Sequence, residues 1–155
     1  MKISDAGLQL IKTSEGFRGN VYSDVAGFPT VGYGHKLLPG ESFPEGITEE
    51  QATALLETDI QGAQGAVARL VKVALTQGQY DALVDFTYNL GAERLESSTL
   101  LKYLNAGRYE DAGEQLLAWD MAGGKPQPGL VKRRQDELAL WNGSAVQHAP
   151  LSVEL

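Results

Sequence analysis

Two carboxyl residues near the start of the chain are spaced in a way that could support acid–base chemistry. Glu15 is followed after eight residues by Asp24. We expect Glu15 at the C-terminal end of a first helix, where the helix dipole and desolvation both disfavour the ionised form. Asp24, among Gly, Ser and Thr, should stay hydrated and ionised. Such a pair can split a glycosidic bond, because the protonated carboxyl donates to the leaving oxygen while the carboxylate activates water or stabilises the cationic ring.

Each of these residues also has a structural interpretation when it is taken alone. A Glu near a helix end is more often a solvated surface residue. Asp24 can be a turn residue that bonds to its own backbone, a role compatible with catalysis. Thr30 is a strand former, and His35 is expected to be a hydrogen-bonded structural histidine because no second metal ligand is in view.

The first helix and the segment after it would position this pair. Ser4 or Asp5 can cap the helix, which should end near Ser14 to Gly16. Glycine and proline then interrupt every helical period between residues 16 and 46. The residue types there that favour extended backbone are Tyr22, Thr30, Val31 and Tyr33. The sequence therefore predicts a small antiparallel sheet with tight turns.

The remainder of the chain has the patterns of helices. Capping boxes at Thr48–Gln51 and Thr76–Gln79 predict a long helix and a central core helix that stops at Gly91. Shorter helices are expected at about 98–106, 109–120 and 130–142. The predicted fold class is α+β, with a sheet lobe at about 15–47 and a helical lobe at about 70–143 that includes the N-terminal helix. We expect the active-site cleft between these lobes, and a loose tail at 144–155.

Composition narrows the class of protein. A length of 155 residues predicts one domain, against a prior of roughly 150 residues per domain. The 13 Lys and Arg against 20 Asp and Glu give a net charge of −7, which argues against a nucleic-acid partner. The absence of cysteine and the presence of two histidines exclude disulfides and thiolate or multi-histidine metal sites. We expect no membrane anchor, because no apolar stretch approaches the roughly 18 residues of a spanning helix.

The spacing Glu15, Asp24, Thr30, followed by Gly-x-Gly-His ending at His35, resembles the active-site signature of phage-type lysozymes, the endolysin muramidases of glycoside hydrolase family 24. The segments Gln79–Leu83, Tyr88–Gly91 and Gly129–Leu130, with Arg133, Arg134 and Glu137, are similar to helical-lobe motifs of that family. The resemblance extends from about Ile3 to Asn142.

The resemblance implies a lysozyme-like fold and specific residue roles. Glu15 would be the general acid, Asp24 the base or electrostatic partner, and Thr30 the hydroxyl that holds the attacking water. His35 would support the site from behind, and Tyr88 and Asn89 would line the cleft where sugar rings lie. Family members generally invert, which requires about 6.5 to 9.5 Å between the two carboxyls. Neither a cofactor nor a metal is implied.

One cation of the last predicted helix is also a candidate for substrate binding. Arg134 shares a helical face with apolar residues, and we predict that it faces the cleft. Arg133 instead faces Glu137 one turn on, where a surface pair is expected.

The expected function is that of a monomeric endolysin that hydrolyses the β-1,4 bond between N-acetylmuramic acid and N-acetylglucosamine in bacterial peptidoglycan and so lyses the host. It would stay in the host cytoplasm until a separate export or holin-type route brings it to the periplasm or cell wall. Two alternatives are a wall-glycan binding module without turnover and a transglycosylase that forms an anhydro sugar. The intact Thr30 favours hydrolysis. The acidic surplus should make the encounter with an anionic wall slower or more salt-sensitive.

Overall fold

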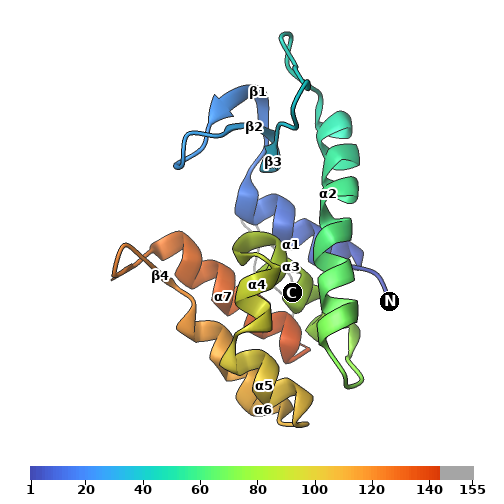
Figure 1. Cartoon of the computed structure of the whole chain (residues 1–155), viewed down its shortest axis with the longest axis vertical. Helices are drawn as coiled ribbons and strands as arrows, with labels where there is room; N and C mark the ends of the chain where they lie inside the picture. Colours follow the sequence, from blue (N-terminus) through green and yellow to red (C-terminus); the bar gives the residue numbers. More distant parts are fainter. Residues whose placement is uncertain (144–155) are drawn as a thin grey trace, which may run out of the picture. The chain divides into compact units, whose positions relative to one another are not determined.

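The computed structural model describes residues 1–143, so the predicted tail at 144–155 lies outside the described residues. The elements, traced in Figure 1, are α1 (Asp5–Glu15), β1 (Arg18–Ser23), β2 (Pro29–Gly32), β3 (His35–Lys36), α2 (Glu49–Leu70), α3 (Gln77–Leu90), α4 (Ala92–Glu96), α5 (Thr99–Asn105), α6 (Tyr109–Gln115), the 3₁₀ turn η1 (Leu116–Ala118), β4 (Met121–Ala122), β5 (Lys125–Pro126) and α7 (Pro128–Trp141). This content confirms the predicted α+β class.

The chain divides into two compact units, which we describe separately. One unit, called here the sheet unit, is Ile11–Gln61. The other, the helical unit, combines Met1–Leu10 with the chain from Gly62 onward.

The first helix begins and ends as predicted. The Ser4 hydroxyl accepts a hydrogen bond from the Gly7 amide at 3.3 Å, which satisfies a free donor of the first turn. The helix ends at Glu15, and Gly16 follows with φ of +75°, a conformation that glycine adopts without a Cβ penalty. Glu15 is therefore the last helical residue before the sheet.

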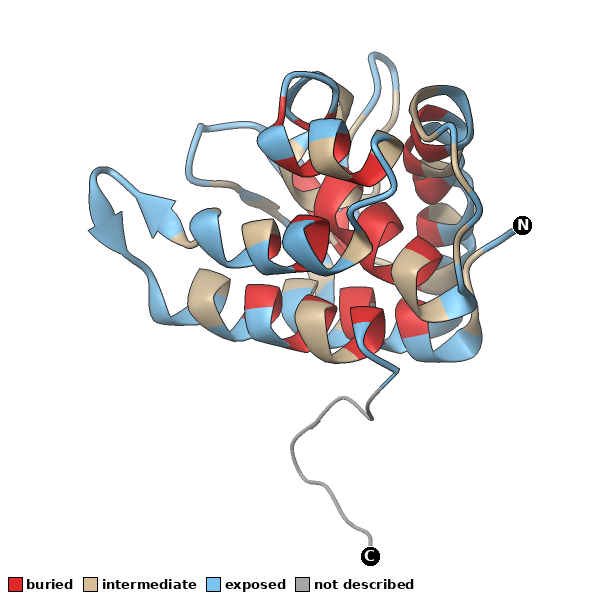
Figure 2. Cartoon of the chain, turned by 90° about the horizontal axis from the view of Figure 1, so that it is seen from below, coloured by how far each residue is buried: buried red, intermediate tan, exposed pale blue. Residues whose placement is uncertain are grey.

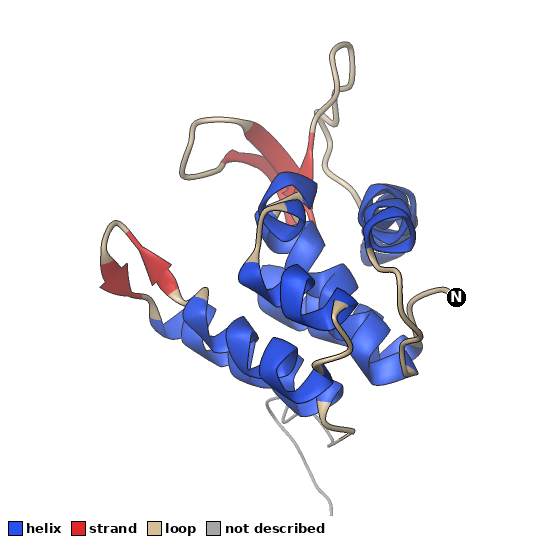
Figure 3. Cartoon of the chain, turned by 60° about the horizontal axis from the view of Figure 1, so that its bottom comes forward, coloured by secondary structure: helices blue, strands red, loops and turns tan. Residues whose placement is uncertain are grey.

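The sheet is antiparallel, as predicted, and its strands are ordered β1-β2-β3. They are drawn in red in Figure 3. Thr30 of β2 lies opposite Tyr22 of β1 and Lys36 of β3, while Val31 lies opposite His35. Because residues paired across strands share a face and successive residues alternate, Thr30 and Lys36 occupy one face and His35 the other. Tyr33, which the sequence predicts in a strand, lies instead in the turn between β2 and β3.

Both predicted capping boxes are present. The Thr48 hydroxyl accepts from the Gln51 amide at 3.2 Å, and the Gln51 side chain accepts from the Thr48 amide at 2.8 Å. Thr76 and Gln79 make the same reciprocal pair at the start of α3. These bonds depend on residues three apart, which is why the sequence pattern identifies them.

In the helical unit the core forms around α3, which packs against α7. Leu83, Val84 and Phe86 of α3 have no exposed surface. Gly78 lies so close to α7 that a Cβ on it would collide with the carbonyl oxygen of Leu140. The long helices carry both buried and exposed residues along their length, which is the colour pattern in Figure 2.

In the helical unit the structure differs from the prediction in two short elements and in the end of one helix. The sequence analysis predicted neither the helix α4 nor the hairpin β4–β5. The helix predicted at 109–120 ends at Gln115 and continues as a 3₁₀ turn. Within residues 1–143, no helix combines the length and apolar character needed to cross a membrane.

Candidate active site

Asp24 begins the turn that joins β1 to β2. Its Oδ1 accepts hydrogen bonds from the backbone amides of Ala26 at 2.9 Å and Phe28 at 2.8 Å. The Asp24 amide in turn donates to the Phe28 carbonyl at 2.9 Å. The turn role that the sequence allowed for Asp24 is therefore present, and it fixes the carboxylate at the end of the hairpin.

The second oxygen of Asp24 has a different partner. Its Oδ2 accepts from the Lys36 ammonium of β3. The hydrogen bond from Lys36 and those from the amides of Phe28 and Ala26 together hold the pKa of Asp24 below its usual range. Asp24 therefore carries its charge at neutral pH, as its sequence surroundings predicted.

Thr30 is attached to the same turn. The residue is 2% exposed, and its hydroxyl donates to the Phe28 carbonyl at 2.9 Å. Since this bond uses the only hydroxyl proton, the lone pairs of Oγ1 are left to accept from a water molecule. Asp24 and Thr30 are therefore both positioned by the backbone of Phe28.

Glu15 lies at the last position of α1 and is half-buried. The last turn of α1 contacts the β2–β3 turn, since the Lys12 ammonium lies 5.6 Å from the centre of the Tyr33 ring. The ring centre of Phe17, which follows the helix, lies 5.8 Å from that of Tyr33. The Tyr33 hydroxyl donates to Glu49 at 2.6 Å. Burial and this hydrogen bond raise the pKa of Tyr33 to about 12. The Tyr33 hydroxyl therefore keeps its proton, and with it this hydrogen bond, at neutral pH.

His35 is buried on the face of the sheet opposite Thr30. Its Nδ1 lies 2.7 Å from Asp59 and its Nε2 2.8 Å from Glu41. Burial alone would lower the pKa of His35, but the hydrogen bonds and charges of the two carboxylates outweigh it and raise the pKa. This position fits the predicted supporting role, and contact with substrate stays a prediction.

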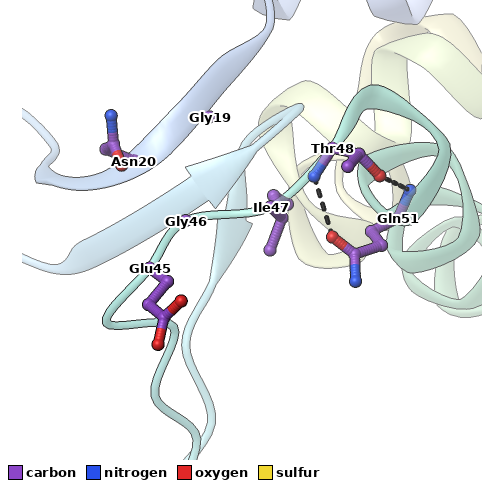
Figure 4. A pocket seen from close by; sticks show the side chains of 7 residues that line it. All are labelled: Gly19, Asn20, Glu45, Gly46, Ile47, Thr48 and Gln51. Carbon is purple, nitrogen blue, oxygen red and sulfur yellow. Dashed lines mark hydrogen bonds between the residues drawn. The ribbon is translucent and has the colours of Figure 1, made fainter.

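The sheet unit also contains a hollow of about 340 Å³, shown in Figure 4. Its lining residues are Gly19, Asn20, Glu45, Gly46, Ile47, Thr48 and Gln51. Thr48 and Gln51 bond to each other as the cap of α2 (Figure 4). None of the predicted site residues lines this hollow, so it gives no support to the predicted chemistry.

The other three predicted residues belong to the helical unit. Tyr88 and Asn89 lie half-buried in the last turn of α3. The Asn89 side-chain oxygen accepts from Arg134 at 2.8 Å. Because arginine can only donate, this bond assigns the oxygen of the Asn89 side-chain amide, and not its NH2, to the side that faces Arg134. The predicted cleft and the sugar contacts of these residues stay predictions.

The two arginines of α7 have different partners from those expected. Arg133 is buried and pairs with Asp85 of α3 at 2.7 Å, so the predicted surface pair between Arg133 and Glu137 is wrong. Glu137 pairs instead with Arg134 at 2.8 Å, and neither has exposed surface. Arg134 is therefore a buried ion-pair partner that holds Asn89, and its predicted contact with substrate stays a prediction.

The sequence analysis missed two ion-pair partners, which are Lys36 for Asp24 and Asp85 for Arg133. Counting outward from a two-residue turn at Tyr33–Gly34 would have placed Lys36 opposite Val31, whereas the observed register is centred on Tyr33 and places Lys36 opposite Thr30. Asp85 carries no local signal, because its partner Arg133 is 48 residues away. Among residues 1–143 the structure gathers no three Asp, Glu or His side chains that could hold a metal ion.

Comparison with known proteins supports the resemblance noted in the sequence. The Phage lysozyme family model matches residues 12–137. The chain is 46% identical over 144 residues to the endolysin of Bacillus phage B103, covering 91% of this chain and 54% of that protein. It is 43% identical over 148 residues to the endolysin of Acyrthosiphon pisum secondary endosymbiont phage 1, covering 93% of this chain and 100% of that protein. The chain thus spans about half the length of the first relative.

A solved structure agrees with these sequence matches. A crystal structure of a P22 lysozyme mutant superposes with a TM-score of 0.83 at 39% identity, covering 92% of this chain and 99% of that one. The predicted lysozyme-like fold is therefore confirmed. Together the family model and the relatives show that this chain belongs to the phage lysozyme family.

Proposed function

We propose that the chain is an endolysin that hydrolyses the β-1,4 bond between N-acetylmuramic acid and N-acetylglucosamine in bacterial peptidoglycan. Membership of the phage lysozyme family and the endolysin relatives support this activity. The observation that carries the proposal is that the backbone of Phe28 holds both Asp24 and Thr30 in the sheet unit, with Glu15 at the end of α1.

In the proposed reaction, Glu15 protonates the glycosidic oxygen as the bond breaks. A water molecule donates one hydrogen bond to Thr30 and another to the Asp24 carboxylate, so that its remaining lone pair can attack the anomeric carbon. Asp24 accepts the proton that this water releases, and its negative charge stabilises the cationic ring. This pathway inverts the anomeric configuration.

A product assay on purified sacculi tests the proposal. Glu15→Gln keeps the size of the side chain but removes its acidic proton, so release of reducing ends should fall by about 10²- to 10⁴-fold. Glu57→Gln, an exposed change in α2, is the matched control and should retain the parental rate. Retention of the parental rate by a folded Glu15→Gln protein would overturn the assignment.

The same assay separates the two alternatives. A wall-glycan binding module would sediment with sacculi without releasing reducing ends. A transglycosylase would release fragments with an anhydro sugar, which mass spectrometry distinguishes by the missing water. The Thr30 hydroxyl, with lone pairs available to hold that water, favours hydrolysis.

The biological setting is also proposed from the relatives. Several of them are phage endolysins, and others are named SAR-endolysins. We infer that this protein acts as a monomer on the host wall, after cytoplasmic accumulation and delivery by a separate export or holin-type route.

A further inference from the structure

The two carboxylate oxygens of Asp24 are held by different parts of the sheet unit. Oδ1 accepts from two amides of its own turn, at Ala26 and Phe28. Oδ2 accepts from Lys36, which is 12 residues away on β3. The turn therefore fixes one oxygen, while the other depends on a side chain from another strand.

The strand register explains how Lys36 reaches this carboxylate. Lys36 lies opposite Thr30, so both side chains leave the same face of the sheet. Its ammonium lies 5.4 Å from the centre of the ring of Phe28, a residue that is 55% exposed. The Lys36 side chain thus passes over Phe28 to reach Asp24, and it is itself 61% exposed.

We propose that Lys36 is a positioning residue that holds the second oxygen of Asp24 in place beside Thr30. This inference rests on the proposed function, because it assigns Lys36 a role in the same hydrolysis. Phe28 serves as the common support, since its backbone fixes both Asp24 and Thr30 and its ring contacts Lys36.

The charges around Asp24 decide the direction of the expected effect. Lys36 from β3 and the turn amides face the carboxylate, while on β1 the Arg18 guanidinium stacks 4.2 Å from the Tyr22 ring centre. The other titratable group of the reaction is Glu15, at the end of α1. Without Lys36 the pKa of Asp24 would rise, so Asp24 would lose its charge at a higher pH. Since Lys36 is largely exposed, salt should screen much of its effect.

The test measures kcat/KM on soluble peptidoglycan fragments as a function of pH, at low and high ionic strength. Lys36→Met should move the acid limb of the profile to higher pH, with a several-fold loss of kcat/KM that is greatest at acidic pH. The difference from the parent should shrink in about 1 M salt, where the Debye length is about 3 Å. Lys36→Arg retains a cationic donor and should restore the parental acid limb.

Two controls separate positioning from a change in net charge and from a loss of folding. Lys102→Met removes the same charge from an exposed position in the helical unit and should leave the profile parental. Thermal unfolding of Lys36→Met should match that of the parent, since exposed ion pairs contribute about 0 to 1 kcal/mol.

Three results would overturn the inference. One is a Lys36→Met profile that superimposes on that of the parent at low salt. Another is an equal loss at every pH and salt that Lys36→Arg does not restore, which would indicate direct substrate contact. The third is an equal effect of Lys102→Met, which would indicate net charge. If Glu15→Gln is inactive while Lys36→Met is parental, the proposed function stands and this inference alone fails.

Discussion

Asp24 and His35 experience opposite electrostatic surroundings within one small sheet. A lysine and two amides hold Asp24 ionised, whereas two carboxylates favour the charged form of His35. Both shifts arise from specific partners placed by the strands and turns and not from the net charge of the chain. Acidic partners thus stabilise a cation on one face of the sheet, while the opposite face keeps an anion available for chemistry.

A pH-dependent contribution to stability follows from His35. Its folded-state pKa lies above the usual 6.5, so its contribution is complete below 6.5 and is lost as the pH rises through the raised value. The Leu38 amide and His35 lower the pKa of Glu41 from 4.5, so its contribution is complete above 4.5 and is lost as the pH falls through the lowered value. The pair should therefore stabilise most between about pH 4.5 and 6.5.

Denaturant unfolding of His35→Gln across this pH range checks the expectation. The variant should lose about 1.5 to 3 kcal/mol of unfolding free energy near pH 5.5, the range for hydrogen bonds to charged groups. The loss should become smaller towards pH 8. His148→Gln controls for loss of a histidine as such, and a loss for His35→Gln that is the same at both pH values would contradict the linkage.

At the scale of elements, the parts of the fold that the sequence predicted are those set by neighbouring residues. The caps at Thr48 and Thr76 involve residues three apart, and Gly16 ends α1 through its own backbone. The helix α4 escaped prediction because it has five residues, no side-chain cap and one buried residue, Leu95. Such a segment has no apolar periodicity to detect.

In the candidate site, too, the features that depend on neighbouring residues could be predicted from the sequence, and those that depend on strand register or helix packing could not. The spacing of Glu15, Asp24 and Thr30 is visible in the sequence, as is the ability of Asp24 to hold its own turn. The Lys36 contact requires the strand register. The pairing of Arg133 with Asp85 requires the packing of α7 on α3. Glu137 lies on α7 itself, but helical spacing alone assigned it to Arg133 and not to Arg134.

A pair of glycine substitutions tests the close contact between α3 and α7. Gly78→Ala would drive a Cβ into the backbone of Leu140, which has no flexible end to move away. We expect a loss of at least about 3 kcal/mol of unfolding free energy, the upper end for overpacking. Gly65→Ala, within α2, has no atom within 4 Å of the added Cβ and should gain about 0.5 to 1 kcal/mol.

Chemical denaturation of the two variants beside the parent measures both changes. Replacement of glycine by alanine is thus expected to lower the free energy of unfolding in α3 and to raise it in α2. An equal gain for Gly78→Ala would show that the helices are not in such close contact.

At the scale of the whole molecule, the charge of −7 opposes approach to the proposed substrate. Peptidoglycan carries carboxylates, so long-range repulsion should slow the encounter without altering the reaction in the site. Raising the ionic strength from about 0.01 to 0.15 M shortens the Debye length from about 30 to 8 Å. Hydrolysis of sacculi by the parent should therefore become several-fold faster over this range.

Sacculi whose carboxylates have been amidated provide the matched control for this prediction. They offer the same glycosidic bonds without the negative charge, so the acceleration by salt should largely disappear. Neutralising exposed acids far apart in sequence, with Glu50→Gln and Glu114→Gln together, should reduce the salt effect on untreated sacculi while leaving the rate on amidated ones unchanged. If the rate on untreated sacculi instead fell steadily as salt was added from the lowest concentration, attraction by positively charged side chains near the site would govern the encounter. That result would contradict a dominant effect of the net charge.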